Sequence, residues 1–125
     1  MRRKIELEYI FSSSVKVLFS RLSTSMGLTE WFADDVIQKS DQYTFIWNGS
    51  ERRTATLIDL KPNSSVRFQW NDADEEEYFE FSIQLDPLIA DVALIITDFV
   101  DEDELVDAMD LWDKQIESLH RTLGA

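Results

Sequence analysis

The sequence predicts an α+β domain in which a curved antiparallel sheet of about six or seven strands wraps around a long C-terminal helix. Three features predict this: an alternating segment at the start, a series of short alternating segments between residues 36 and 99, and one long amphipathic segment at the end. A single long helix after a many-stranded sheet buries its apolar stripe most simply across the concave face of that sheet. Because such a closed sheet often leaves a cavity, this order of elements also directs the search for a site.

The first segment, residues 4–11, alternates apolar side chains with charged ones, which is typical of a half-buried strand. Two short helices are expected after it, one over residues 15–22 behind three serines that can act as N-caps, and one over residues 28–32. Period-two alternation then predicts six further strands, over residues 36–39, 43–47, 53–60, 66–70, 79–85 and 92–99. Asn48-Gly49-Ser50 is a hairpin signal, and Asp86-Pro87 is expected to end the strand before it.

The last segment predicts one helix from about residue 101 to residue 123. Asp101 is expected as its N-cap, with Glu104 in the capping-box position, and Gly124 as its terminator. The single histidine, His120, lies with Arg121 in the last turn, where a cation complements the helix dipole. The apolar stripe at helical spacing consists of Leu105, Ala108, Met109, Trp112, Ile116, Leu119 and Leu123.

Length and composition indicate a single domain over residues 1–125, with 44% hydrophobic and 12% aromatic residues. The chain has no cysteine and one histidine, which excludes disulfides, thiol catalysis and a Cys–His metal cluster, so we expect neither a metal nor a cofactor. A net charge of −13 argues against binding to nucleic acid or to anionic membranes. Because residues 5–9 alternate apolar with acidic and no apolar run reaches transmembrane length, we expect a cytoplasmic protein without membrane insertion.

Several short aromatic motifs along the chain occur in a specific order. Trp31-Phe32 follows the two predicted helices, and the others are Phe45-Ile46-Trp47-Asn48-Gly49, Leu60-Lys61-Pro62, Val66-Arg67-Phe68-Gln69-Trp70 and Leu111-Trp112. In this order the chain resembles the START-like (SRPBCC) superfamily with its helix-grip fold. Within it, the chain is most similar to small bacterial relatives of the C-terminal domain of the activator of the heat-shock chaperone ATPase. Members often carry a histidine on the last strand, where this chain has Ile96-Thr97-Asp98.

The predicted cavity has an aromatic candidate lining. We expect it to consist of Trp31, Phe32, Phe45, Trp47, Phe68, Trp70, Phe81, Met109 and Trp112. The alternative is that these side chains simply fill the core. Two isolated acids in apolar strands, Asp59 and Asp98, are expected to point outward or to lie at a strand end, but the near-continuous apolar run of the last strand leaves its facing open. If either acid pointed inward, burial would raise its pKa and make it a candidate general acid or base.

The functional hypothesis is a non-enzymatic module that binds a small apolar ligand between the sheet and the C-terminal helix. One alternative is a chaperone-related or assembly adaptor whose acidic runs, over residues 72–77 and 101–104, meet a basic protein partner. The acidic runs are otherwise expected to be solvated. A second alternative is an enzyme of the cyclase or aromatase type, which requires polar groups inside the cavity. A homodimer formed through a sheet edge is also left open.

Overall fold

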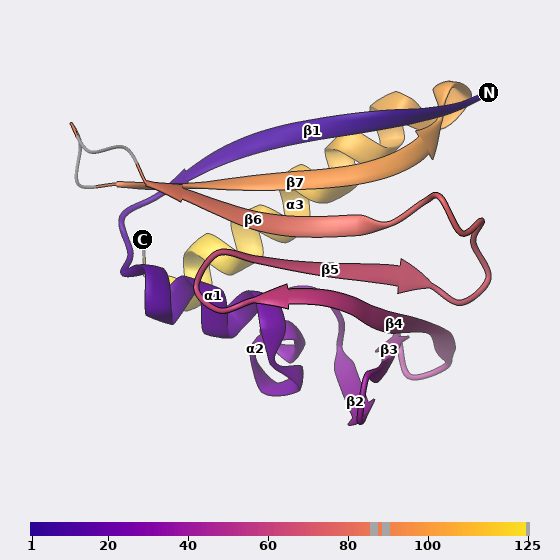
Figure 1. The fold of residues 1–125 in the computed structure, drawn as a ribbon, viewed down its shortest axis with the longest axis horizontal. Coiled ribbons are helices and arrows are strands. Elements are labelled where there is room, and N and C mark those ends of the chain that lie inside the picture. The colour runs from indigo at the N-terminus through magenta and orange to yellow at the C-terminus, as the bar shows by residue number, and fades with distance from the viewer. Residues whose placement is uncertain (86–87, 89–90, 125) are drawn as a thin grey trace.

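The computed structural model describes residues 1–85, 88 and 91–124, and it confirms the predicted α+β helix-grip fold (Figure 1). One antiparallel sheet holds seven strands in the order β1-β7-β6-β5-β4-β3-β2. The strands are β1 (Arg2–Phe11), β2 (Asp35–Lys39), β3 (Gln42–Trp47), β4 (Glu51–Lys61), β5 (Ser65–Trp70), β6 (Phe79–Leu85) and β7 (Val92–Asp101). The predicted stop at Asp86-Pro87 lies outside the described residues.

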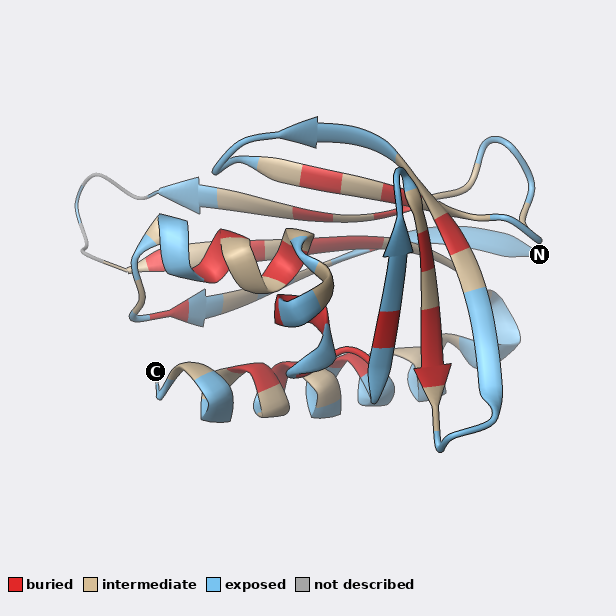
Figure 2. Cartoon of the chain, turned by 90° about the horizontal axis from the view of Figure 1, so that it is seen from below, coloured by how far each residue is buried: buried red, intermediate tan, exposed pale blue. Residues whose placement is uncertain are grey.

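The helices are α1 (Val15–Ser23), α2 (Ser25–Thr29) and α3 (Leu105–Leu123), with a short 3-10 turn, η1 (Glu102–Glu104), before α3. Viewed edge-on, α3 runs across the concave side of the sheet, and β2, β3 and β4 curl toward it at one end (Figure 2). Helices α1 and α2 cover the other end of the same face. The buried residues therefore lie between one curved sheet and three helices.

The second helix begins and ends earlier than the sequence predicts. We expected residues 28–32 to be helical because Gly27 looks like a helix breaker, but Gly27 lies inside α2. A Cβ atom at this position would lie 2.2 Å from the carbonyl oxygen of Ser20 in α1. Glycine is therefore needed for the close packing of the two helices. As a consequence, Trp31 and Phe32 follow α2 as part of an irregular segment that leads into β2.

The predicted capping box at the start of the last helix does not form. Asp101 precedes η1, but its side chain makes no capping hydrogen bond. Its carboxylate instead lies 3.0 Å from the amino group of Met1 at the end of the neighbouring strand β1. The predicted terminator is confirmed, since Gly124 adopts the left-handed conformation (φ 68°) that glycine favours.

Phe32 is the best-connected aromatic residue of the core. Its ring contacts six others at centroid distances of 5.0 to 6.0 Å, those of Trp31, Phe45, Trp47, Phe79, Phe81 and Trp112. These rings come from the α2–β2 segment, β3, β6 and α3. Ring pairs of this kind are worth about 0.5–1.5 kcal/mol each beyond their burial. One side chain therefore joins the sheet to its covering helix.

Helix α3 is also fixed to the first strand along its length. The Tyr9 hydroxyl donates a hydrogen bond of 2.7 Å to the carboxylate of Asp113, and the ring of Phe11 stacks on His120 at 4.0 Å. Burial and the Asp113 carboxylate raise the pKa of Tyr9. These contacts hold the middle and the last turns of α3 against β1, while Trp112 packs on Phe81 of β6.

Replacement of Trp112 by alanine should destabilise the fold strongly. Trp112 is 7% exposed and packs on Phe32 and Phe81, and truncation of a buried tryptophan typically costs about 3–5 kcal/mol. Its neighbour Leu111 is 59% exposed, so Leu111→Ala should change the free energy of unfolding by only about 0.5 kcal/mol. Urea denaturation of both variants tests this. Equal midpoints would mean that the stripe of α3 does not carry the packing described above.

Candidate ligand-binding cleft

An open cleft of about 650 Å³ lies between α3, the α2–β2 segment and the curled end of the sheet. Its aromatic lining consists of Trp31, Phe32, Trp47, Trp70, Phe79 and Trp112. All four tryptophans of the chain therefore belong to this one cleft. Helix α3 adds Ala108, Leu111, Gln115 and Ser118 on the opposite side. A cleft of this size and composition is typical of small-molecule sites.

Backbone acceptors hold two of the indole rings in place. The carbonyl oxygen of Phe32 accepts hydrogen bonds from Trp47 Nε1 at 2.9 Å and from the amide of Gln115 at 3.1 Å. Trp31 Nε1 donates to the carbonyl oxygen of Arg21 at 2.7 Å. Because these donors are satisfied, the rings can be part-buried without leaving a polar group unpaired. The cleft is thus pre-formed on the side of the α2–β2 segment.

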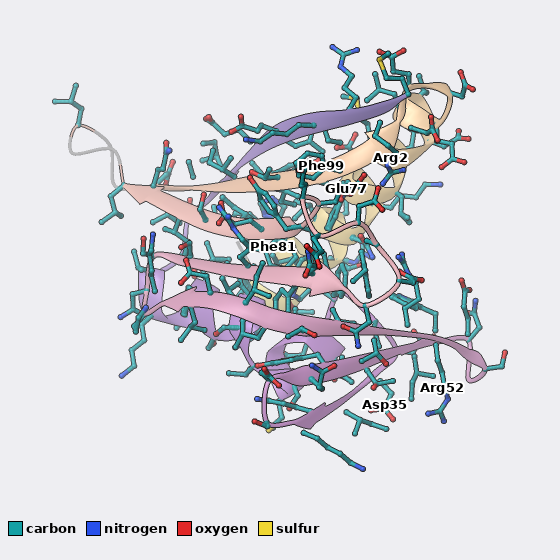
Figure 3. All side chains as sticks on the ribbon, turned by 45° about the vertical axis from the view of Figure 1, so that its right-hand side comes forward. Arg2, Asp35, Arg52, Glu77, Phe81 and Phe99 are labelled. Atoms are coloured by element: carbon teal, nitrogen blue, oxygen red, sulfur yellow. The ribbon has the colours of Figure 1, made fainter. Side chains whose placement is uncertain are left out.

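A second recess of about 560 Å³ adjoins the first toward the end of β1. The two share a common boundary formed by Arg53, Trp70, Asp98, Ala108 and Leu111. Beyond it, Arg2 pairs with Glu77 at 2.6 Å and donates to the carbonyl oxygen of Phe99 (Figure 3). The acidic loop is therefore only partly solvated, because the Glu77 side chain is 14% exposed and ion-paired.

Asp98 lies at this boundary and points inward, so our expectation that it points outward is wrong. Its carboxylate accepts hydrogen bonds from Trp112 Nε1 at 3.0 Å and from the backbone N–H of Phe99 at 2.8 Å. Burial raises the pKa of Asp98, and these hydrogen bonds partly offset that rise. The near-continuous apolar run of β7 concealed which face Asp98 occupies. Asp59 is exposed as expected, with its carboxylate 3.9 Å from the ammonium group of Lys61.

Arg53 is the one guanidinium in the larger cleft. It lies over the Trp70 ring at 4.0 Å from the centroid, and it forms an ion pair of 2.8 Å with Asp72. This arrangement pairs the cation on one side with a carboxylate and on the other with an indole face. The Arg53 guanidinium also lowers the pKa of Asp72 by hydrogen bonding.

The comparisons with known proteins agree on the family. A model of the START-like superfamily domain matches residues 1–125. The chain belongs to the START-like superfamily. The solution structure of the protein BfR322 from Bacteroides fragilis is 40% identical, with a TM-score of 0.69 over 97% of this chain and 90% of that one.

Two further solved structures share the fold at lower identity. The Aha1 dimer from Colwellia psychrerythraea is 18% identical, with a TM-score of 0.81 over 97% of this chain and 96% of that one. The AHSA1 protein from Silicibacter pomeroyi is also 18% identical, with a TM-score of 0.71 over 98% of both chains. No functionally curated protein matches the chain.

Within this START-like domain the predicted lining residues divide into two groups. Trp31, Phe32, Trp47, Trp70 and Trp112 lie around the cleft. Phe45, Phe68 and Phe81 are fully buried in the core and are not among the residues that line it. Met109 is 39% exposed on α3, and it does not line the cleft either. Phe45, Phe68 and Phe81 thus belong to the core, whereas the tryptophans border the cleft, with Trp31 and Trp112 largely buried there. That these residues bind a ligand stays a prediction.

Sequence reasoning missed Phe79, Arg53 and Gln115 as cleft residues. Phe79 could have been found, since it alternates with Phe81 on the same strand face. Arg53 and Gln115 carry no comparable signal, because their place depends on how the sheet curls and where α3 lies. Among the described residues no group of His, Asp and Glu could hold a metal ion, and no helix is long and apolar enough to cross a membrane.

The inward position of Asp98 has a measurable effect on stability. The pKa of Asp98 in the folded protein lies above the value of about 3.9 expected in the unfolded chain. In the pH window between these two pKa values, the folded state binds more protons than the unfolded state does. The contribution of Asp98 to stability therefore falls as the pH rises through the window. The Asp98→Asn variant lacks this titration, so its stability relative to wild type should improve from pH 3.5 upward and then level off. Urea denaturation at several pH values tests this, and a difference that is constant or falls with pH would contradict the burial of Asp98.

Proposed function

We propose that this START-like domain binds a small apolar ligand in the cleft between α3 and the sheet. The observation that carries the proposal is the gathering of all four tryptophans around one open cleft of about 650 Å³. Side chains from the α2–β2 segment, the sheet and α3 all contribute to it. The ligand would contact indole rings whose positions are fixed by hydrogen bonds to the protein.

The expected affinity follows from apolar burial. At about 25 cal/mol per Å², a ligand that removes roughly 300 Å² of apolar surface from water gains about 7.5 kcal/mol. Micromolar binding corresponds to about 8.2 kcal/mol, and losses of ligand freedom reduce the gain. Affinities no tighter than the micromolar range are therefore expected for ligands of this size. The side-chain amide of Gln115 is engaged in a hydrogen bond to the carbonyl oxygen of Phe32, so it helps to hold the cleft in shape.

A protein-binding adaptor stays a prediction alongside this proposal. The relative described as an Aha1 dimer is 18% identical, so it supports the shared fold and nothing more specific. The acidic loop retains four exposed carboxylates, those of Asp72, Asp74, Glu75 and Glu76, and the last three could meet a basic partner while Asp72 pairs with Arg53. A homodimer is likewise an open prediction. Neither idea accounts for the tryptophan-lined cleft.

Titration with the neutral apolar fluorophore N-phenyl-1-naphthylamine tests the proposed function. Binding should saturate at micromolar concentration and change the intrinsic fluorescence, because every tryptophan lines the cleft. In Ala108→Phe a large side chain on α3 should occupy the cleft and weaken binding about tenfold or more, the factor that 1.4 kcal/mol represents.

Val106→Phe is the matched control, since Val106 lies on the same helix, is 70% exposed and does not line the cleft. This variant should bind as wild type does. Absence of saturable binding to folded wild-type protein would overturn the proposed function. Equal loss in both variants would move the binding site away from the cleft.

A further inference from the structure

The charges around the cleft are unbalanced. Its lining includes four carboxylates, those of Glu30, Asp34, Glu51 and Asp98, against the single guanidinium of Arg53. That guanidinium already pairs with Asp72. Glu30 is paired with Arg21 of α1, and Asp34 accepts a hydrogen bond from the backbone of Asn48. The cleft therefore has a negative potential, in a protein whose net charge is −13.

Asp98 is the carboxylate that lies deepest in this arrangement. Among the described residues, its two hydrogen bonds both come from neutral donors, the indole of Trp112 and the backbone of Phe99. A carboxylate has about four acceptor positions, so about two remain unused at a residue that borders both recesses. No cation among the described residues forms an ion pair with it. The guanidiniums of Arg2 and Arg53 attract the Asp98 carboxylate only from a distance. A largely buried charge without a direct ion pair is costly, and a ligand that supplied a cation at contact distance would relieve that cost.

The aromatic surface beside Asp98 suits a cation as well. The guanidinium of Arg53 already lies over the Trp70 ring at 4.0 Å, in the geometry of a cation–π contact. The partly exposed Trp47 offers a further indole ring in the same cleft, whereas Trp112, which hydrogen-bonds to Asp98, packs on Phe32 and Phe81. Indole faces attract ammonium groups more strongly than phenyl faces do. An apolar cation would thus meet both a carboxylate and aromatic rings.

We propose that the cleft selects apolar ligands that carry a protonated amine, with Asp98 as the counter-ion of the ammonium group and the tryptophans in contact with the apolar part. This inference rests on the proposed function and specifies its ligand class. The opposite class, apolar carboxylates, fits less well. Such a ligand would have to compete with Asp72 for Arg53 while it faced four carboxylates.

Three probes with the same ten-carbon chain separate these classes, decylamine, decanol and decanoate. At pH 7 the amine is protonated, the alcohol neutral and the acid ionised. Tryptophan fluorescence titrations of wild type below the micellar concentrations should rank the ammonium at least about tenfold tighter than the alcohol, the factor that 1.4 kcal/mol represents. The carboxylate should bind most weakly. This comparison needs no variant, so it does not depend on how any substitution folds.

The Asp98→Asn variant then assigns the selectivity to one residue. It should lose the preference for decylammonium over decanol, measured as the ratio of the two dissociation constants in this one variant. Asp59→Asn is the control, because it also removes one negative charge but lies outside the cleft on β4. This variant should retain the full preference, which excludes a general effect of net charge.

Each other outcome has a clear meaning. Equal binding of all three probes to wild type would overturn the selection for amines and leave the proposed function standing. Tighter binding of decanoate would overturn it in favour of Arg53 as the recognition residue. If Asp98→Asn and Asp59→Asn both lost the preference for decylammonium, that preference would reflect long-range attraction to the net negative charge and not contact with Asp98, and the proposal would be overturned. If none of the three probes binds, the proposed function fails with it.

Discussion

The contacts of Phe32 are the interaction on which the rest of this structure depends. Its ring packs against aromatic side chains from β3, β6 and α3, and its carbonyl oxygen accepts hydrogen bonds from Trp47 and Gln115. One residue in an irregular segment therefore holds the curled end of the sheet and the closing helix at a fixed separation. Phe32 also lines the cleft that lies between these elements.

The aromatic residues have different roles that follow from their chemistry. Phe45, Phe68 and Phe81 have no polar atom in their side chains, so they are fully buried on the inner face of the sheet. Each tryptophan has an N–H group that needs an acceptor, and three of the four find one at the border between the core and the cleft. The tryptophans therefore line the cleft, while the phenylalanines beneath them keep the sheet curved around α3.

Asp98 departs from the rule that buried positions are apolar, and its place explains why this is tolerated. Hydrogen bonds from Trp112 and Phe99 satisfy part of the carboxylate, and its unused acceptor positions adjoin the cleft. A buried carboxylate that borders the proposed ligand site is the kind of local exception expected where function is located. Asp98 is also one of the carboxylates that give the cleft its negative charge.

Sequence patterns by themselves determined the number, order and type of the strands, the long closing helix and its terminator, because period two, period 3.6 and glycine at a helix end are local signals. They also singled out the aromatic residues, since such residues are buried or line sites wherever they occur. Tertiary structure decided the rest. Position 27 of α2 requires glycine because the helix packs closely on the backbone of Ser20. Asp101 pairs with the amino group of Met1 and does not cap the last helix. The tertiary packing also decides which aromatic residues line the cleft and that Asp98 points inward. Neither could be predicted from the sequence, because contacts between distant segments produce no local hydrophobic period.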